Sequence, residues 1–331
     1  MKNIESFYPL SPMQQGILFH SLYASDSGMY CDQFSCNIQG DFNSLAFQQA
    51  WQQLVEHHPI LRTSFVWEGL KEPTQIVHNQ VKLLIEQHDW RLMTKAEQEE
   101  RIEAFLNVEQ RGFALSQAPL MRLTLIRLAD TNYLFIWCRH HLLLDGWSAS
   151  LLLDEVFKLY NALNECKHLH LEKPRAYRDY IAWLQQQDLR SAEAFWRRRL
   201  QGFTSPTSLG VQKSRHRRSE DKGYEQQQLG LSIAETAALQ SWAKQQHLTL
   251  STVMHGAWAI LLSRYSGEED VVFGSVVSGR GSLAGSESMV GVLINTLPMR
   301  VYANPKEDRS EERRVGKECE GMCRSRWSPY H

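Results

Sequence analysis

The sequence predicts an α+β fold in two lobes. Its 331 residues suffice for about two domains of roughly 150 residues each. Helix-like and strand-like segments are mixed without the regular strand–helix–strand alternation of a doubly wound sheet, and the chain shows no internal repeat. Apolar residues make up 43% of the chain, an ordinary globular share, so each lobe can bury its own core.

The first lobe, residues 1–175, is predicted to begin with a helix that Ser11 caps and that has Pro12 in its first turn. A second helix carries Trp51 and Leu54 at helical spacing before Pro59 ends it. The same criteria predict strands over 33–42, 63–67 and 74–78, a helix over 94–113, and two strands within 119–141 joined by the polar turn 129–132.

The segment HHLLLDGWS, residues 140–148, is predicted to lie between a strand and a helix. The strand before it is apolar throughout, which indicates burial on both faces. Ser148 stands at a helix-cap position, ahead of an apolar stripe that begins at Leu151 and Leu152. The polar side chains of this segment are therefore expected at the end of a buried strand.

The second lobe, residues 176–308, is predicted after a polar connector. Its expected elements are helices over 177–187 and 191–203, a capped helix from Ser232, a helix over 252–267, a strand over 270–280 and an apolar segment over 289–301. The basic tract 213–223 has no apolar periodicity and no interleaved aromatic residues, so we interpret it as a solvated loop.

Residues 309–331 break this pattern. They are rich in Arg and Glu, poor in aliphatic residues and without periodicity, so they cannot offset the entropy cost of ordering. They also resemble the translation of a sequencing-library adapter in RSEERRVGKEC and CRSRWSPYH. We expect this tail to be non-native and exclude it from the fold prediction.

Charge and composition exclude several classes of protein. The formal net charge of −1 gives no field that would favour nucleic acid or an anionic membrane. The N-terminus lacks the apolar core of a signal peptide and no apolar run approaches about 20 residues, so a cytoplasmic location without membrane contact is expected. The cysteines show no CxxC pair, and we expect no metal site: Cys31, Cys36, Cys138, Cys166, Cys319 and Cys323.

Two adjacent histidines carry the strongest chemical pattern. His140 and His141 end the buried strand, and Asp145 follows one tight turn later. A neutral imidazole accepts a proton near pH 7, so this arrangement suits proton transfer, although a histidine pair can also simply finish a strand. The pair at 57–58 has no Asp-Gly after it and is expected at a helix end, whereas His20 and His255 lie in apolar helices and are expected in the core or a groove.

This segment, RHHLLLDGWS, resembles the HHxxxDG motif of the condensation domains of nonribosomal peptide synthetases. Four further segments resemble other motifs of that family in the right order, and the motifs together span residues 8–301: YPLSPMQQGILFH, HHPILRTSF, DVVFGSVVSGR and MVGVLINTLPMRV. The resemblance implies a two-lobed, pseudo-dimeric sandwich like chloramphenicol acetyltransferase. Because family members continue beyond the last motif, it also implies that the second lobe is incomplete here.

The resemblance also implies roles for individual residues. His141, the second histidine, is the catalytic one, as a base or as a hydrogen-bond anchor for the attacking amine, with His140 beside it. Gly146 is a donor to the oxyanion or an ordinary turn glycine. Asp145 is structural and pairs with an arginine, for which Arg280 and Arg62 are the candidates at matching positions.

The implied activity is an acyltransferase that forms an amide bond. Donor and acceptor arrive as thioesters on the 4'-phosphopantetheine arms of upstream and downstream peptidyl carrier proteins. Adenylation domains of the same synthetase are further implied partners. The resemblance implies that the domain itself binds no cofactor. The opening YPLSPMQ and the segment HHLLLDGWS look more like the subtype that joins a D-configured donor to an L-acceptor. Two alternatives stay open: a stand-alone CoA-dependent acyltransferase, and a catalytically silent docking or scaffold module.

Overall fold

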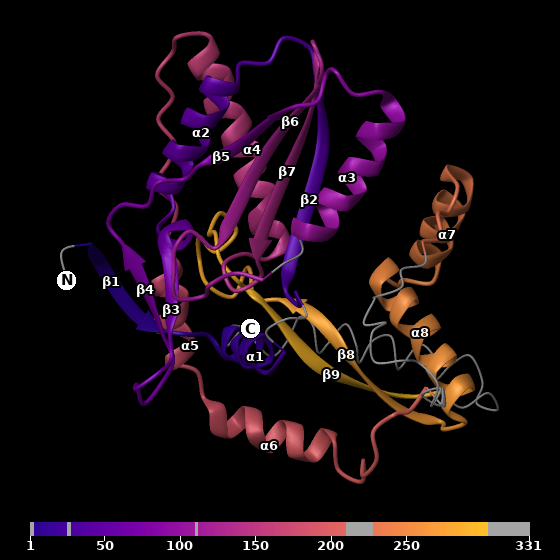
Figure 1. Cartoon of the computed structure of the whole chain (residues 1–331). Coiled ribbons are helices and arrows are strands. Elements are labelled where there is room, and N and C mark those ends of the chain that lie inside the picture. The colour runs from indigo at the N-terminus through magenta and orange to yellow at the C-terminus, as the bar shows by residue number, and fades with distance from the viewer. Residues whose placement is uncertain (1–2, 25–27, 110–111, 210–227, 304–331) are drawn as a thin grey trace. The chain divides into compact units, whose positions relative to one another are not determined.

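A computed structural model describes residues 3–24, 28–109, 112–209 and 228–303 of the chain (Figure 1). The chain divides into two compact units. The first comprises Met1–Gln187 together with Ser278–Asn295, and the second comprises Asp188–Val277 together with the chain from Thr296. The boundary predicted after residue 175 stays a prediction, and the basic tract 213–223 and the tail 309–331 lie outside the described residues.

A four-stranded sheet forms the centre of the first unit, in the order β2-β7-β6-β5. β7 is antiparallel to both of its neighbours, whereas β5 runs parallel to β6. The strands are β2 (Cys31–Gln39), β5 (Ile85–Asp89), β6 (Met121–Ala129) and β7 (Asn132–His140). All but the first residue of β7 are buried, which confirms the prediction from its apolar sequence.

Helices cover both faces of this sheet (Figure 1). On one face α2 (Ser44–His57) and α4 (Gly146–Asn164) pack against each other and against the main core, which includes Trp51, Phe135 and Trp137. On the other face α3 (Lys95–Glu109) packs over a smaller cluster. Alternation of side chains along β7 sends odd and even positions into these two different cores.

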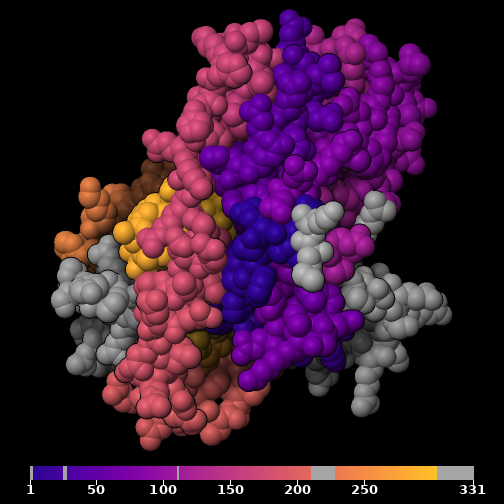
Figure 2. Space-filling model, turned by 90° about the vertical axis from the view of Figure 1, so that its left-hand side faces the viewer, coloured from indigo at the N-terminus to yellow at the C-terminus, as the bar shows by residue number. Residues whose placement is uncertain are grey.

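A second sheet has three strands in the order β1-β4-β3, and α1 (Pro12–Tyr23) follows its first strand in the chain. Its strands are β1 (Ile4–Pro9), β3 (Thr63–Val66) and β4 (Thr74–His78), with the 3-10 helix η2 (Pro59–Arg62) ahead of β3. The helix α5 (Tyr177–Gln185) contacts β1, and Figure 2 shows these segments side by side in pink and indigo.

The second unit has a much smaller described core. Its buried cluster consists of Ala259, Leu262, Val271, Met299 and Val301. Its elements are α6 (Leu189–Arg199), α7 (Ile233–Gln245), α8 (Leu250–Ser266) and a two-stranded sheet of β8 (Asp270–Ser278) and β9 (Ile294–Tyr302).

Most predicted elements are confirmed, and one cap is corrected. Ser11 caps α1 in a capping box with Gln14, and Ser232 caps α7 in a capping box with Glu235. The cap of α4 was predicted at Ser148 and is instead Asp145, whose side chain accepts the Ser148 N–H, so the helix begins at Gly146. No strand was predicted over Ile4–Pro9 or Ile85–Asp89. Within the described ranges, no helix is both long and apolar enough to cross a lipid bilayer.

Candidate active site

His140 is a buried and neutral residue at the last position of β7. Its Nδ1 accepts the N–H of Leu142 at 3.1 Å, so the ring hydrogen lies on Nε2, which faces the hydroxyl of Ser21 at 3.3 Å. That hydroxyl in turn donates to the carbonyl of Ile17 on α1 at 2.8 Å. Burial, with a smaller contribution from His141, lowers the pKa of His140 to about 4.

Within the described ranges, one ring nitrogen of His141 has a hydrogen-bond partner and the other has none. Its Nδ1 lies 2.7 Å from the carbonyl oxygen of Leu144, which can only accept, so Nδ1 carries the hydrogen. When the ring carries this single hydrogen, Nε2 presents its lone pair. The backbone N–H of His141 donates to the carbonyl of Tyr30 at 2.8 Å, and the side chain is half-buried. The structure thus offers an imidazole that is held at Nδ1 and has an acceptor nitrogen at Nε2, as a general base requires.

Asp145 is fully buried, and four hydrogen bonds satisfy its carboxylate. Oδ1 accepts the N–H of Ser148 at 2.8 Å, and Oδ2 accepts the N–H of Leu293 at 2.9 Å. The guanidinium of Arg280 donates to the two oxygens at 2.9 and 3.2 Å. Because these donors occupy both oxygens, the carboxylate holds the turn after His141 and caps α4.

Arg280 extends this network into the segment 278–295. Its Nη1 donates to the carbonyls of Ser286 and Met289 at 2.8 and 2.7 Å, and its Nη2 also reaches the Ser148 hydroxyl at 2.8 Å. That hydroxyl donates to the carbonyl of Gly291 and accepts the N–H of the same residue. The arginine therefore ties the HHLLLDG turn to a segment more than a hundred residues later in the chain.

Arg62, the other candidate partner of Asp145, lies elsewhere in the first unit. Its guanidinium pairs with Glu5 at 2.6 Å and donates to the carbonyls of Val55, His78 and Asn79. The structure therefore brings Arg280 to Asp145 and places Arg62 in a separate cluster between α2 and β1.

Gly146 is exposed at the first position of α4. A Cβ added there would meet no atom within 4 Å, so the position opens toward solvent. Among the described residues its N–H has no hydrogen-bond partner, as expected for the first turn of a helix. Within the described part of the chain, Gly146 therefore has an unoccupied N–H donor, and it lies a few residues after His141 in the chain.

The other histidines form separate arrangements. His58 is buried and its Nε2 lies 2.5 Å from the carboxylate of Glu155 on α4. Burial, with a smaller contribution from His58, lowers the pKa of His57, whose ring contacts the carbonyl of Glu172. His255 contacts the hydroxyl of Ser275 in the second unit. The pair at 57–58 lies at the end of α2, as predicted, although His58 is buried.

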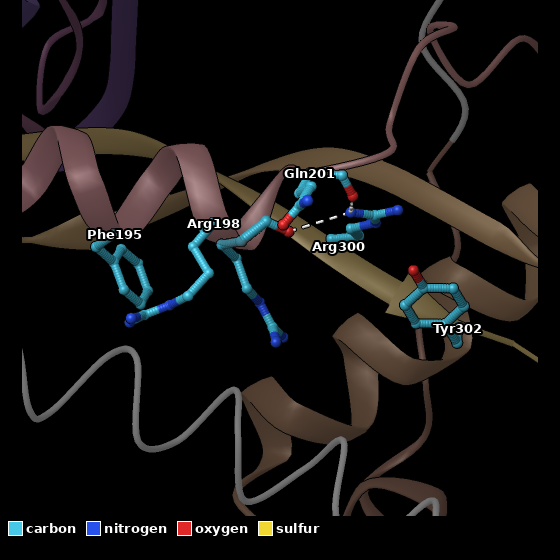
Figure 3. A pocket seen from close by; sticks show the side chains of 6 residues that line it. Phe195, Arg198, Gln201, Arg300 and Tyr302 are labelled. Carbon is cyan, nitrogen blue, oxygen red and sulfur yellow. Dashed lines mark hydrogen bonds between the residues drawn. The ribbon is translucent and has the colours of Figure 1, made fainter.

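A cavity of about 460 Å³ in the second unit is a poor candidate for catalysis (Figure 3). Arg300 reaches it from β9, but this guanidinium is paired with Asp270 at 2.6 Å and donates to the carbonyls of Arg199 and Gln201. Among the described residues that line the cavity, none carries an imidazole, carboxylate or thiol: Phe195, Arg198, Arg199, Gln201, Arg300 and Tyr302. The described part of the chain also contains no group of three or more potential metal ligands.

Several residues of the site were not predicted. Gln14 donates to the carbonyl of Leu142 at 2.9 Å and so supports the turn from α1. Ser21 binds His140, and Tyr30 binds and faces His141. Gln14 lies in the first motif, which could have signalled it. The others act across the fold, where the sequence alone carries no sign of the contact.

Comparisons with known proteins give the family. The family model described as the condensation domain matches residues 4–330. The chain is 46% identical over 310 residues to one of the linear gramicidin synthase proteins of Brevibacillus parabrevis, covering 93% of this chain and 6% of that protein. It is 38% identical over 315 residues to bacitracin synthase 3 of Bacillus licheniformis, covering 93% of this chain and 5% of that protein. The chain thus spans a small part of these relatives.

Solved structures agree on the fold. The starter condensation domain of rhizomide synthetase matches with a TM-score of 0.80 at 24% identity, over 98% of this chain and 73% of that one. The first condensation domain of the calcium-dependent antibiotic synthetase matches with a TM-score of 0.77 at 18% identity, over 96% and 75%. The chain belongs to the condensation-domain family of nonribosomal peptide synthetases. The predicted fold class, α+β of the chloramphenicol acetyltransferase type, is confirmed.

Proposed function

We propose that this chain forms a peptide bond between a donor acyl thioester and the α-amine of an acceptor aminoacyl thioester. The observation that carries the proposal is the imidazole of His141, which Leu144 holds by Nδ1 so that Nε2 can accept a hydrogen. Membership of the condensation-domain family supports this choice of reaction.

In the proposed reaction the acceptor nitrogen attacks the donor carbonyl carbon, and the carbon–sulfur bond breaks. The nitrogen loses one proton, and the departing thiolate gains one, so the reaction needs no further reactant. Nε2 of His141 either takes the proton from the amine and passes it to sulfur or anchors the amine by a hydrogen bond. A positioned base is worth roughly 10²–10⁴-fold, and orientation of the two thioesters supplies the rest.

Gly146 is the proposed donor to the oxyanion. Its N–H lies in the first turn of α4, where the helix dipole favours negative charge. Asp145 caps the same helix without reaching the reacting atoms, because its oxygens are occupied by Arg280, Ser148 and Leu293. His140 supports the site as a buried neutral neighbour, fixed by Ser21 and Leu142.

The proposed partners are the upstream and downstream peptidyl carrier proteins of one synthetase, with its adenylation domains. Their 4'-phosphopantetheine arms deliver both substrates, and no cofactor of the chain itself enters the reaction. We further propose a D-configured donor and an L-acceptor, on the basis of the opening YPLSPMQ and the segment HHLLLDGWS. The predicted cytoplasmic location also stays a proposal.

A transfer assay followed by mass spectrometry tests this function. Two carriers are loaded, one with an L-aminoacyl acceptor and one with the donor in D or L form, and the dipeptidyl carrier is measured. We expect product with the D donor in wild type and in the control His57→Ala, and none with His141→Ala at unchanged far-UV circular dichroism. Transfer by His141→Ala contradicts the residue assignment. Transfer from CoA without a carrier, or carrier binding without turnover by wild type, contradicts the function.

A further inference from the structure

Tyr30 adopts a backbone conformation that its side chain disfavours. Its φ is +67°, in the left-handed region, where a bulky residue is an outlier. The N–H of Cys31 donates to the carbonyl of Gly28 at 3.0 Å, so residues 28–31 form a β-turn with Tyr30 at its third position. A turn with positive φ at that position ordinarily has glycine or asparagine there.

Two other described residues that are not glycine have positive φ, and both have a local reason for it. Cys166 and His247 follow α4 and α7, and the residue after each donates back into the helix, from Lys167 to Ala162 and from Leu248 to Ala243. A left-handed residue at this place is the ordinary way to end a helix. Tyr30 ends no helix, so its strain needs another explanation.

The side chain of Tyr30 lies against the candidate catalytic histidine. Its ring centroid is 6.5 Å from that of His141, at an interplanar angle of 55°, and 6.4 Å from that of His20. Its carbonyl accepts the His141 N–H at 2.8 Å, a bond that glycine would make equally well. The backbone therefore explains the turn, but only the ring explains a tyrosine in it.

We propose that Tyr30 is a positioning residue whose ring limits rotation of the His141 imidazole and keeps Nε2 directed at the substrate amine. This inference rests on the proposed function of His141. Leu144 holds the ring by one hydrogen bond at Nδ1, so the imidazole can still rotate about this hydrogen bond. The Tyr30 ring limits this rotation on the side of the imidazole that it faces. Strain at a functional site is retained when the side chain is needed there.

Three variants separate the ring, the hydroxyl and the strain. Tyr30→Phe keeps the ring and should transfer within about twofold of wild type, because positioning does not need the hydroxyl. Tyr30→Gly keeps the turn and its carbonyl but should lower kcat about 10- to 100-fold at nearly constant KM. Its Tm should stay close to that of wild type, because relief of positive φ opposes the lost packing. The control Cys166→Gly relieves strain far from the site and should leave transfer unchanged.

Nitrogen-15 NMR of the imidazoles reports on the ring without requiring activity. With signals assigned by His141→Gln, wild type and Tyr30→Phe should show one His141 ring state with hydrogen on Nδ1, and Tyr30→Gly should show a broadened or averaged signal. The proposal is overturned if Tyr30→Gly leaves either kcat or this spectrum unchanged, or if Tyr30→Phe loses as much activity as Tyr30→Gly. Inactive wild type with an ordered His141 that disorders in Tyr30→Gly refutes the proposed function and supports the positioning role.

Discussion

At the scale of single residues, the turn after β7 is held by groups whose hydrogen-bonding capacity is filled. His140 binds Ser21 and Leu142, and Asp145 binds donors from α4 and from the segment that carries Arg280. Among the described residues, Nε2 of His141 and the N–H of Gly146 have no hydrogen-bond partner, so they offer an acceptor and a donor at this turn. Satisfied neighbours therefore isolate the two groups that the proposed chemistry needs.

Breaking the buried ion pair should unfold the site rather than change its chemistry. Asp145→Ala or Arg280→Ala leaves a buried charge uncompensated, at a cost of about 3–5 kcal/mol in the free energy of unfolding. The double variant Asp145→Leu with Arg280→Met should cost less than the sum of the single variants. Urea denaturation measures both effects. Additive costs would show that the two side chains do not act as a pair.

His140 should make stability depend on pH. Its pKa is about 4 in the folded chain against an ordinary 6.5, so the unfolded chain takes up the proton first as the pH falls. The stabilisation is fully present above pH 6.5 and is lost between 6.5 and 4, by roughly 3 kcal/mol. His140→Gln should therefore show a shallower fall in unfolding free energy over this window than wild type. Equal slopes would contradict the assignment.

The sequence identified the polar residues of this site better than their partners. His141, Asp145, Gly146 and Arg280 belong to motifs, so their presence near one another could be expected. The roles of the Leu144 carbonyl and of Tyr30 could not, because a backbone acceptor and a packed ring leave no pattern in the sequence. Ser148 was misplaced as a cap because Asp145, three residues earlier, also suits that role and its carboxylate accepts the Ser148 N–H.

At the scale of elements, long apolar segments were predictable and short polar ones were not. The strands of the pair β6 and β7 are apolar enough to be recognised directly. β1 and β5 are short and mostly exposed, and their sequences IESFYP and IEQHD lack a clear apolar alternation. They form only because β4 and β6 offer a paired edge, which is information from distant parts of the chain.

The segment from Ser278 to Asn295 should tolerate no added volume at Gly291. A Cβ there would lie 2.2 Å from the ring of Tyr177, a fully packed side chain that also donates to the carbonyl of Val292 at 2.9 Å. Gly291→Ala should therefore lower the free energy of unfolding by about 1–3 kcal/mol. It should also weaken acyl transfer, because a displaced Gly291 would disturb Ser148 and, with it, Asp145.

Gly16 on α1 is the matched control for that variant. A Cβ at Gly16 meets nothing within 4 Å, and alanine suits a helix better than glycine. Gly16→Ala should stabilise the first unit by about 0.5–1 kcal/mol in the same denaturation experiment. A destabilised Gly16→Ala, or an unaffected Gly291→Ala, would contradict the packing described at these two positions.

At the scale of the whole molecule, stability should be uneven. The first unit has a large core around β6 and β7, whereas the described cluster of the second unit contains five buried residues. Helix α7 buries only Ala243. Hydrogen exchange should therefore show the slowest amides in β6 and β7 and far faster ones in α7. Equal protection in these elements would show that the second unit has a larger stable core than its described contacts suggest.

The bonds around Asp145 also set an order of assembly during synthesis. The carboxylate accepts from Leu293, which lies 148 residues later in the chain, and from Arg280. A ribosome therefore completes the HHLLLDG turn long before it makes the residues that neutralise and hold it. Until then the Asp145 carboxylate lacks its donors from Arg280 and Leu293. A fragment that ends before Arg280 should accordingly hold the sheet but not the turn, however intact its histidines are.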